Sequence, residues 1–135
     1  NRLLTRFERT VWSEEQGTGE AWVAGERASV TVLNAYHPLA GNHHRVLAQR
    51  VHASEVRQAL GHPAGRTLSR VSPLEPGEDG TLPQVLWQMN YPDLPARSSD
   101  FEAVTAAAEF QEVTRTMRGL LSRFGRGIWK NVPVD

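Results

Sequence analysis

The stretch Ser29-Val30-Thr31-Val32-Leu33-Asn34-Ala35-Tyr36 is rich in β-branched residues and ends at His37-Pro38, which predicts a β-strand. Residues 42–60 follow and carry apolar residues at roughly helical spacing, namely Leu47, Val51, Val56 and Leu60. Gly61 and Pro63 come directly after this segment and are typical stop signals. The sequence therefore predicts a strand followed by a helix.

Two further extended segments, residues 66–71 and 83–91, lie on either side of a polar stretch. That stretch contains Pro73, Pro76, Gly77 and Gly80. Proline and glycine are disfavoured inside strands and common in the loops that join them. The pattern predicts a hairpin with a long loop.

A second, longer helix is expected after this hairpin. The spacing of Ser99-Asp100-Phe101-Glu102 is that of a capping box, in which the Ser and Glu side chains satisfy free amide groups at a helix start. Apolar residues then recur at steps of three and four, at Phe110, Val113, Met117, Leu120 and Phe124. An earlier stripe is out of frame with this row, so we expect a break near residues 106–108.

Gly125 follows the apolar row and is predicted to take the left-handed position that ends the helix. Residues 126–134 alternate between apolar and polar side chains, with Ile128 and Val132 on one face. This alternation predicts a closing strand.

The predicted order is strand, helix, strand, strand, helix, strand. It is the split β-α-β-β-α-β arrangement of a ferredoxin-like α+β fold. Right-handed crossovers place both helices on one face of a four-stranded antiparallel sheet. The other face then needs a cover, and we expect a second ferredoxin-like unit as partner, stacked sheet against sheet.

A partial internal repeat supports such a second unit. Residues 3–12 match residues 120–129 at a constant offset of 117, with six identical and two conservative pairs in ten positions. We interpret residues 1–15 as the tail of a preceding repeat unit, comprising a helix end and its last strand. Residues 16–27 are glycine-rich and read as a linker, so residues 28–135 form the ferredoxin-like domain.

The composition excludes several classes of function. The 135 residues include no Cys, which rules out disulfides, thiolate nucleophiles and Cys-ligated zinc. Lys+Arg and Asp+Glu balance at 15 each, which argues against a sequence-independent grip on nucleic acid or anionic lipid. No apolar run approaches the roughly 18 residues of a membrane span, and no signal peptide is visible. We expect a cytoplasmic protein with no nucleic-acid or membrane partner.

Strand alternation gathers a candidate binding surface. One face of the first strand carries Val30, Val32, Asn34 and Tyr36, and one face of residues 83–91 carries Val85, Trp87, Met89 and Tyr91. If both faces look toward the helices, they line a mostly apolar cavity with a few polar tips, which suits a hydrophobic small molecule. Asn34, Trp87, Met89 and Tyr91 would then bind it. The competing interpretation is that the same side chains fill the core.

Two further residues have candidate roles. His37 ends the first strand and is the best lone acid or base, with Asn34 or Tyr36 to orient it, and Tyr36 is the second candidate for handling a proton. Arg70 lies within a predicted strand, where alternation turns it either into the cavity or into the interface between units.

Histidine is a common metal ligand, and His37, His43 and His44 lie within eight residues. Adjacent residues on a helix point about 100° apart, so His43 and His44 rarely share one ion. The sequence contains no phosphate-cradling glycine loop and no nucleophile elbow. We predict no metal site and no cofactor.

The pattern resembles the dimeric α/β-barrel superfamily, which includes antibiotic-biosynthesis-monooxygenase-like and NIPSNAP-like proteins. The residues that carry the resemblance are Leu86-Trp87, Glu109-Phe110 and Ile128-Trp129, within residues 28–134. It implies two ferredoxin-like units paired into a barrel, as a homodimer or as a tandem repeat, and the repeat at residues 3–12 favours the tandem form. It also implies a range of activities, from cofactor-free oxygenation and isomerisation to haem chemistry, and some members have no known reaction.

Haem-degrading members use an Asn on the first strand, a Trp ending the third and a His on the second helix. Asn34 and Trp87 match the first two positions, but Thr114 occupies the third and no His follows His62. The resemblance therefore does not imply haem.

Two functions remain open on the sequence. The first is a small-molecule-binding or interaction protein of the NIPSNAP-like or stress-responsive type with no dedicated catalytic set. The alternative is a cofactor-independent monooxygenase or isomerase acting on an aromatic or polyketide-like substrate, with His37 or Tyr36 managing the proton.

Overall fold

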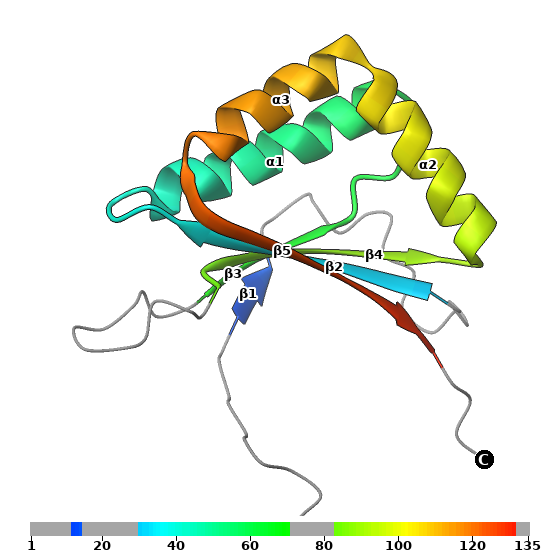
Figure 1. The fold of residues 1–135 in the computed structure, drawn as a ribbon, viewed down its shortest axis with the longest axis horizontal. Helices are drawn as coiled ribbons and strands as arrows, with labels where there is room; N and C mark the ends of the chain where they lie inside the picture. Colours follow the sequence, from blue (N-terminus) through cyan, green and yellow to red (C-terminus); the bar gives the residue numbers. More distant parts are fainter. Residues whose placement is uncertain (1–11, 15–29, 71–82, 132–135) are drawn as a thin grey trace, which may run out of the picture.

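A computed structural model of the chain describes residues 12–14, 30–70 and 83–131 (Figure 1). Its elements, in chain order, are β1 Trp12–Glu14, β2 Val30–Pro38, α1 His43–Ala59, β3 Arg66–Arg70, β4 Val85–Tyr91, α2 Leu94–Ala106, α3 Ala108–Arg118 and β5 Leu121–Lys130. The predicted hairpin loop lies outside the described residues. The strands on either side of it pair antiparallel, as a hairpin requires.

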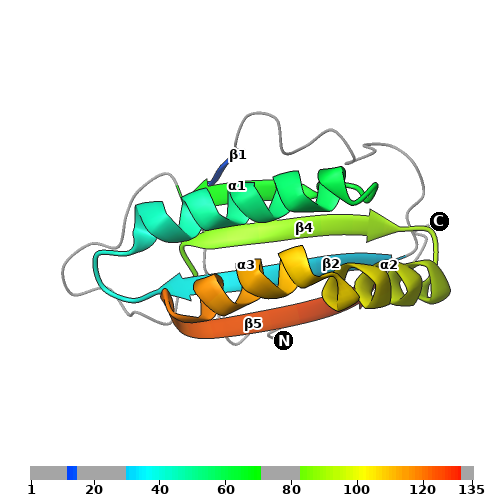
Figure 2. The same cartoon turned by 90° about the horizontal axis from the view of Figure 1, so that it is seen from above.

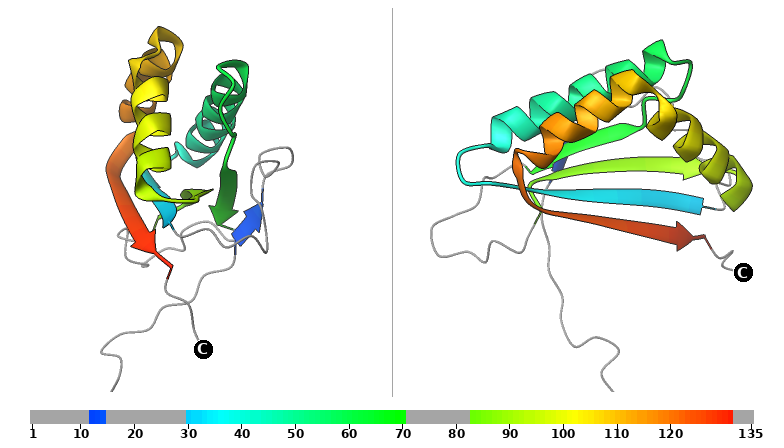
Figure 3. Two further views of the ribbon diagram at one scale, coloured as in Figure 1. Left: turned by 90° about the vertical axis from the view of Figure 1, so that its right-hand side faces the viewer. Right: turned by 45° about the horizontal axis from the view of Figure 1, so that its top comes forward.

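The strands form one antiparallel sheet in the order β1-β3-β4-β2-β5. The first long strand, β2, lies between β4 and β5, so that Asn34 is opposite Trp87 on one side and Arg126 on the other. All three helices lie on one face, with α1 and α3 side by side above the strands (Figures 2 and 3). Without β1, this is the ferredoxin-like topology, and the predicted α+β fold is confirmed.

The interior lies between the sheet and the helices. Its buried apolar cluster comes from every second residue of β2 and β4, together with Val46 of α1 and Met117 of α3. The strand members are Val30, Val32, Tyr36, Val85, Trp87, Met89 and Tyr91. Both sets of alternating side chains therefore face the helices, which is the condition under which the sequence suggests a cavity. Among the described helices, none combines the length and the apolar character needed to cross a bilayer.

Helix α1 ends where it was predicted to end, since Leu60 caps it and Gly61 follows with a φ of 83°. The face that packs on the sheet is not the predicted apolar row. The buried residues are Val46, Arg50, Ala53, Ser54 and Arg57, whereas Leu47, Val51, Val56 and Leu60 are only half-buried. Two arginines therefore occupy positions that the apolar pattern had assigned to the outer face.

The second helical region differs from the prediction at its start. Helix α2 begins at Leu94, and the side chain of Asp93 caps it by accepting a hydrogen bond of 2.8 Å from the amide of Ala96. The capping box predicted at Ser99 is wrong, because Ser99 lies within the helix. Pro95 in the first turn fits this earlier start, since proline lacks the amide hydrogen that a first turn leaves unpaired. The predicted break is confirmed at Ala107, which is extended and separates α2 from α3.

The end of α3 also differs from the prediction. The helix stops at Arg118 with Gly119 as its cap, and β5 begins at Leu121. Gly125 lies within the strand and does not have a positive φ. The apolar row on the helix therefore stops at Met117. Phe124 also lines the cavity described below, but it does so from strand β5. The closing strand runs over Leu121–Lys130, five residues earlier than expected, and residues 132–134 lie outside the described residues.

Strand β1 adds to the edge of the sheet beside β3. Trp12 is opposite Arg70, and Glu14 forms a 3.0 Å ion pair with Arg66. Trp12 is the repeat equivalent of Trp129, and both lie on strands. Most of the repeat falls outside the described residues, so the assignment of residues 1–15 to a preceding unit and of 16–27 to a linker stays a prediction.

Candidate functional site

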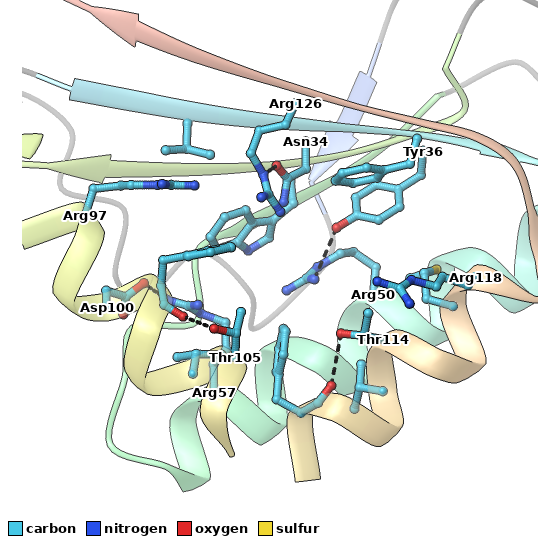
Figure 4. A pocket seen from close by; sticks show the side chains of 18 of the residues that line it. Asn34, Tyr36, Arg50, Arg57, Arg97, Asp100, Thr105, Thr114, Arg118 and Arg126 are labelled. Carbon is cyan, nitrogen blue, oxygen red and sulfur yellow. Dashed lines mark hydrogen bonds and ion pairs between the residues drawn. The ribbon is translucent and has the colours of Figure 1, made fainter. Parts of the chain in front are cut away.

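A cavity of about 360 Å³ lies between the sheet and the three helices (Figure 4). Apolar and aromatic side chains make up most of its wall, which is completed by polar tips from β2 and by arginines from four elements. The lining residues are Val32, Asn34, Tyr36, Arg50, Arg57, Trp87, Tyr91, Arg97, Asp100, Phe101, Val104, Thr105, Phe110, Val113, Thr114, Met117, Arg118, Leu121, Phe124 and Arg126.

Three of the predicted binding residues are found at this cavity, together with Tyr36, which was predicted to handle a proton. Asn34, Tyr36, Trp87 and Tyr91 line it, because they alternate on the helix-facing side of two neighbouring strands. Met89 is on the same face but belongs to the apolar core and is not part of the lining.

The structure places His37 and Arg70 elsewhere. His37 follows Tyr36, so alternation turns it to the opposite face of the sheet, where it is buried away from the cavity. Arg70 lies on β3, opposite Trp12 of the edge strand β1, and does not line the cavity either. The cavity therefore holds one of the two predicted proton-handling residues, Tyr36.

Trp87 lines the cavity from β4, and several groups contact its ring or its indole nitrogen. Its indole Nε1 donates a 2.9 Å hydrogen bond to the carbonyl oxygen of Ala64. The guanidinium carbons of Arg50 and Arg57 each lie 5.0 Å from the ring centroid, within the range of a cation–π contact. Gly65 approaches the ring so closely that it leaves no room for a Cβ atom.

Asp100 of α2 binds groups from three other parts of the chain. Its Oδ2 accepts 2.7 Å from Arg57 Nη2 and 2.5 Å from the Tyr91 hydroxyl, and its Oδ1 lies 2.8 Å from His62 Nδ1. The side chains of Asp100 and Arg57 are only 10% and 5% exposed. Through its hydrogen bonds to Arg57 and Tyr91, this carboxylate links α2 to α1 and to β4.

The pKa values around Asp100 follow from these contacts. Desolvation alone raises the pKa of the Asp100 carboxyl, but hydrogen bonds from Arg57, Tyr91 and His62 outweigh it and lower the pKa below its usual value. The pKa of the Tyr91 hydroxyl is raised, first by desolvation and then by its bond to Asp100. Asp100 is therefore ionised at neutral pH and Tyr91 is protonated.

Arg50 has a different environment from Arg57. It is 4% exposed, and its hydrogen bonds are long contacts to neutral oxygens, 3.4 Å to the Tyr36 hydroxyl and 3.3 Å to Ser54 Oγ. Its Nε has no hydrogen-bond partner among the described residues. Desolvation lowers the pKa of Arg50, and a guanidinium still remains charged.

Exposed aromatic residues and arginines stand at one side of the cavity. Phe101 and Phe124 are 36% and 44% exposed, and Arg126 lies over both rings at 5.1 and 5.4 Å. Arg126 also donates a 2.9 Å hydrogen bond from Nε to Asn34 Oδ1. Arg97 lies 4.4 Å from the Phe101 ring. Together, Arg97, Phe101, Phe124 and Arg126 form a solvent-accessible rim.

Sequence reasoning missed the charged part of this site. One signal was present for the arginines, because Arg50 and Arg57 are seven residues apart and share a helix face with the small residues Ala53 and Ser54. The sequence pattern indicates Asp100 only as part of a capping box. Its contacts come from residues 9, 38 and 43 positions away in sequence, and local spacing does not report such contacts.

The cavity combines the features of a small-molecule site. Its wall is largely apolar, and the Asn34 amide, the Tyr36 hydroxyl and the arginines supply directed donors. Within the described parts of the chain, no three His, Asp or Glu side chains gather into a metal-ligand set.

No protein-family model matches the chain, and no curated protein matches it in sequence. Solved structures do match the fold. A NIPSNAP family protein from Agrobacterium tumefaciens has 13% identity and a TM-score of 0.54, covering 78% of this chain and 88% of its own.

Two other solved structures have the same fold. An uncharacterized NIPSNAP domain protein from Burkholderia xenovorans has 17% identity and a TM-score of 0.53, covering 78% of this chain and 94% of its own. A dimeric protein of unknown function with a ferredoxin-like fold, from Bacteroides fragilis, has 10% identity and a TM-score of 0.53, covering 76% and 95%. The chain thus has the ferredoxin-like fold found in solved NIPSNAP-family proteins, as its sequence pattern suggested.

Proposed function

We propose that this chain is a small-molecule-binding domain of the NIPSNAP-like type, which holds a hydrophobic ligand in the cavity between its sheet and its helices. The observation that carries the proposal is the cavity itself. Its volume of about 360 Å³ lies within the range of small-molecule sites, and its largely apolar wall is interrupted by a few converging polar groups.

The placement of His37 supports binding without a dedicated catalytic set. A cofactor-free oxygenase or isomerase needs a group that takes a proton from the bound substrate. Tyr36 reaches the cavity, but His37 lies on the opposite face of the sheet. The Asp100 carboxylate also lines the cavity, but it is paired with Arg57 at 2.7 Å. If an aromatic probe such as 2-naphthalenemethanol is recovered unchanged after incubation with the protein in air, the result supports the binding function. An oxygenated or isomerised product would assign the enzymatic one.

Filling the cavity is expected to abolish binding. Thr114 of α3 lines the cavity and Thr116 of the same helix is exposed and does not, so Thr114→Phe and Thr116→Phe form a matched pair. An uncharged planar probe, 2-naphthalenemethanol, should raise the melting temperature of the wild type and of Thr116→Phe. At ten times its Kd it contributes about 1.4 kcal/mol, or several degrees. Thr114→Phe should show no shift.

The control also decides what a failure means. Equal shifts in both variants would place the probe outside the cavity. Absence of any shift or calorimetric binding in the wild type, over a panel of such neutral and charged aromatic probes, would remove the proposed function.

The sheet face that carries no helix supports a second part of the proposal, in which another copy of this unit covers it. Leu33, Ala35 and Leu86 alternate onto that face, and Trp129, which is 62% exposed, lies beside Thr31 there. Of these four, Trp129 is exposed, Leu33 and Ala35 are half-buried, and Leu86 is 9% exposed. Exposed apolar side chains such as Trp129 are typical of protein interfaces. The Bacteroides fragilis neighbour with this fold is described as dimeric.

A charge on this face is expected to break the pairing. The wild-type chain of 15.0 kDa should sediment as a dimer, and Leu33→Lys should sediment as a monomer because it buries an unpaired ammonium group in the interface. Leu94→Lys is the control, since Leu94 is 55% exposed on α2. A monomeric wild type, or a Leu33→Lys variant that remains dimeric, would refute pairing through this face.

A further inference from the structure

Arg50 and Arg57 form a contrasting pair inside the cavity. They lie on the same face of α1, both contact the Trp87 ring at 5.0 Å, and both are 4% exposed. Arg57 is neutralised by Asp100 at 2.7 Å. Arg50 contacts no carboxylate among the described residues, and its Nε has no hydrogen-bond partner there.

The cavity wall as a whole is positively charged, although the chain is neutral. Its lining includes Arg50, Arg57, Arg97, Arg118 and Arg126, but Asp100 is its one carboxylate. Since Asp100 is committed to Arg57, the other guanidinium groups have no carboxylate in the wall. Arg50 is the most buried of these, whereas Arg118 and Arg126 are exposed.

A buried charge without a counter-ion is costly, because the interior does not replace the water that the ion has lost. The long contacts to Tyr36 and Ser54 supply neutral oxygens and leave a guanidinium donor unused. A carboxylate is planar and accepts two parallel hydrogen bonds from a guanidinium group. An anion that enters this cavity therefore supplies the partner that Arg50 lacks.

We propose that the ligand of this cavity is an amphipathic carboxylic acid whose carboxylate binds Arg50 and whose apolar body lies against the aromatic and aliphatic wall. This inference rests on the proposed function and names the ligand class of the same site. The Arg50 guanidinium is the one deeply buried positive charge in the wall that has no carboxylate partner, so a ligand with one negative charge would neutralise it. The remaining wall, with Val104, Phe110 and Val113, suits a hydrocarbon or aromatic body.

The arginines at the rim also favour a negatively charged ligand. Arg97 and Arg126 stack on Phe101 and Phe124, so their charges stand beside the aromatic entrance to the cavity. Positive charge around a low-dielectric opening attracts anions and increases their rate of association. The association rate of an anionic ligand is therefore expected to fall as salt is added.

The test compares three probes by calorimetry on the whole chain: 2-naphthoate, the matched neutral 2-naphthalenemethanol, and acetate. A charge-assisted hydrogen bond corresponds to roughly a 10- to 100-fold preference. The wild type should therefore bind 2-naphthoate 10- to 100-fold more tightly than the alcohol, and acetate far more weakly than either. Added NaCl should weaken the binding of naphthoate and leave that of the alcohol unchanged.

Arg50→Met should remove the preference for the carboxylate and keep the binding of the alcohol. Arg45→Met, at an exposed position of α1 outside the cavity, should behave as wild type. Arg50→Lys keeps a positive charge and should therefore retain part of the preference for the carboxylate. It replaces Arg50→Met as the test variant if Arg50→Met does not fold.

The outcomes separate the two proposals. Equal affinity of the wild type for naphthoate and alcohol, or a preference that survives in Arg50→Met, overturns the carboxylate assignment and leaves cavity binding standing. If the wild type binds neither 2-naphthoate nor 2-naphthalenemethanol, the carboxylate assignment is overturned. If it binds no probe of the whole aromatic panel, both proposals are overturned.

Discussion

Replacement of Asp100 by Asn is expected to lower the free energy of unfolding by about 3 kcal/mol at pH 7. The change removes the charge that Arg57 faces at 2.7 Å and leaves a guanidinium group buried without a counter-ion, which is among the costlier single changes in a protein. It also weakens the bonds from Tyr91 and His62. Urea denaturation followed by circular dichroism measures the loss.

The pH dependence of this loss has a defined sign. The pKa of Asp100 is lowered by folding, so the carboxylate stabilises the folded state in full above the unfolded value of about 3.9. That contribution disappears as the pH falls through the lower folded pKa. The difference between wild type and Asp100→Asn should therefore be constant from about pH 5 to 7 and shrink below about pH 4.

Asp93→Asn is the control for this experiment. Asp93 caps the same helix from an exposed position, and Asn is as good a cap as Asp, so its effect should stay within about 0.5 kcal/mol. A loss of similar size in both variants, or no loss in Asp100→Asn, would show that the contacts of Asp100 do not hold α2 in place.

Gly65→Ala is expected to have the second large effect, about 3 kcal/mol. Gly65 has a φ of 72°, a conformation that costs an L-residue roughly 1–2 kcal/mol. A Cβ atom would also clash with Trp87 Nε1 and displace the indole from its bond to Ala64. The free energy of unfolding and the near-ultraviolet dichroism of the tryptophans both report this displacement.

Gly61→Ala separates the two causes. Gly61 has a similar φ of 83°, but nothing lies within 4 Å of a Cβ atom there. It should cost only the conformational part, roughly 1 kcal/mol. Equal losses in both variants would mean that Trp87 does not press on Gly65.

The topology could be predicted from the sequence because each core strand carries a strong local pattern. The alternation of Val30, Val32, Asn34 and Tyr36 assigned the inward face of β2 correctly, and the same rule placed Trp87 and Tyr91 beside them. Pairing between strands then followed from the order of the elements.

The boundaries of the later elements could not be predicted in the same way. Asp93-Leu94-Pro95 and Ser99-Asp100-Phe101-Glu102 both carry start signals, and local spacing does not tell which one the chain uses. Leu120 and Phe124 continue the helical row, but pairing with β2 draws residues 121–130 into a strand. Tertiary contacts decided both cases.

The roles of Arg50, Arg57 and Asp100 could not be predicted, because they depend on contacts between residues far apart in the sequence. Arg50 and Arg57 interrupt an apolar pattern, and only the position of Asp100 explains why the two differ. A sequence-only interpretation favours His37 as the reactive group because histidine titrates near neutral pH. The strand register shows that it faces away from the cavity.

The two methionines of the chain offer the most direct test of the central claim that the cavity binds a small molecule. Met117 lines the cavity, whereas Met89 lies in the core outside its lining. In a spectrum of the protein labelled with ¹³C-methyl methionine, addition of 2-naphthoate should move the Met117 methyl resonance in a saturable way and move that of Met89 far less. A titration in which Met117 stays in place, or in which only Met89 moves, would contradict the account.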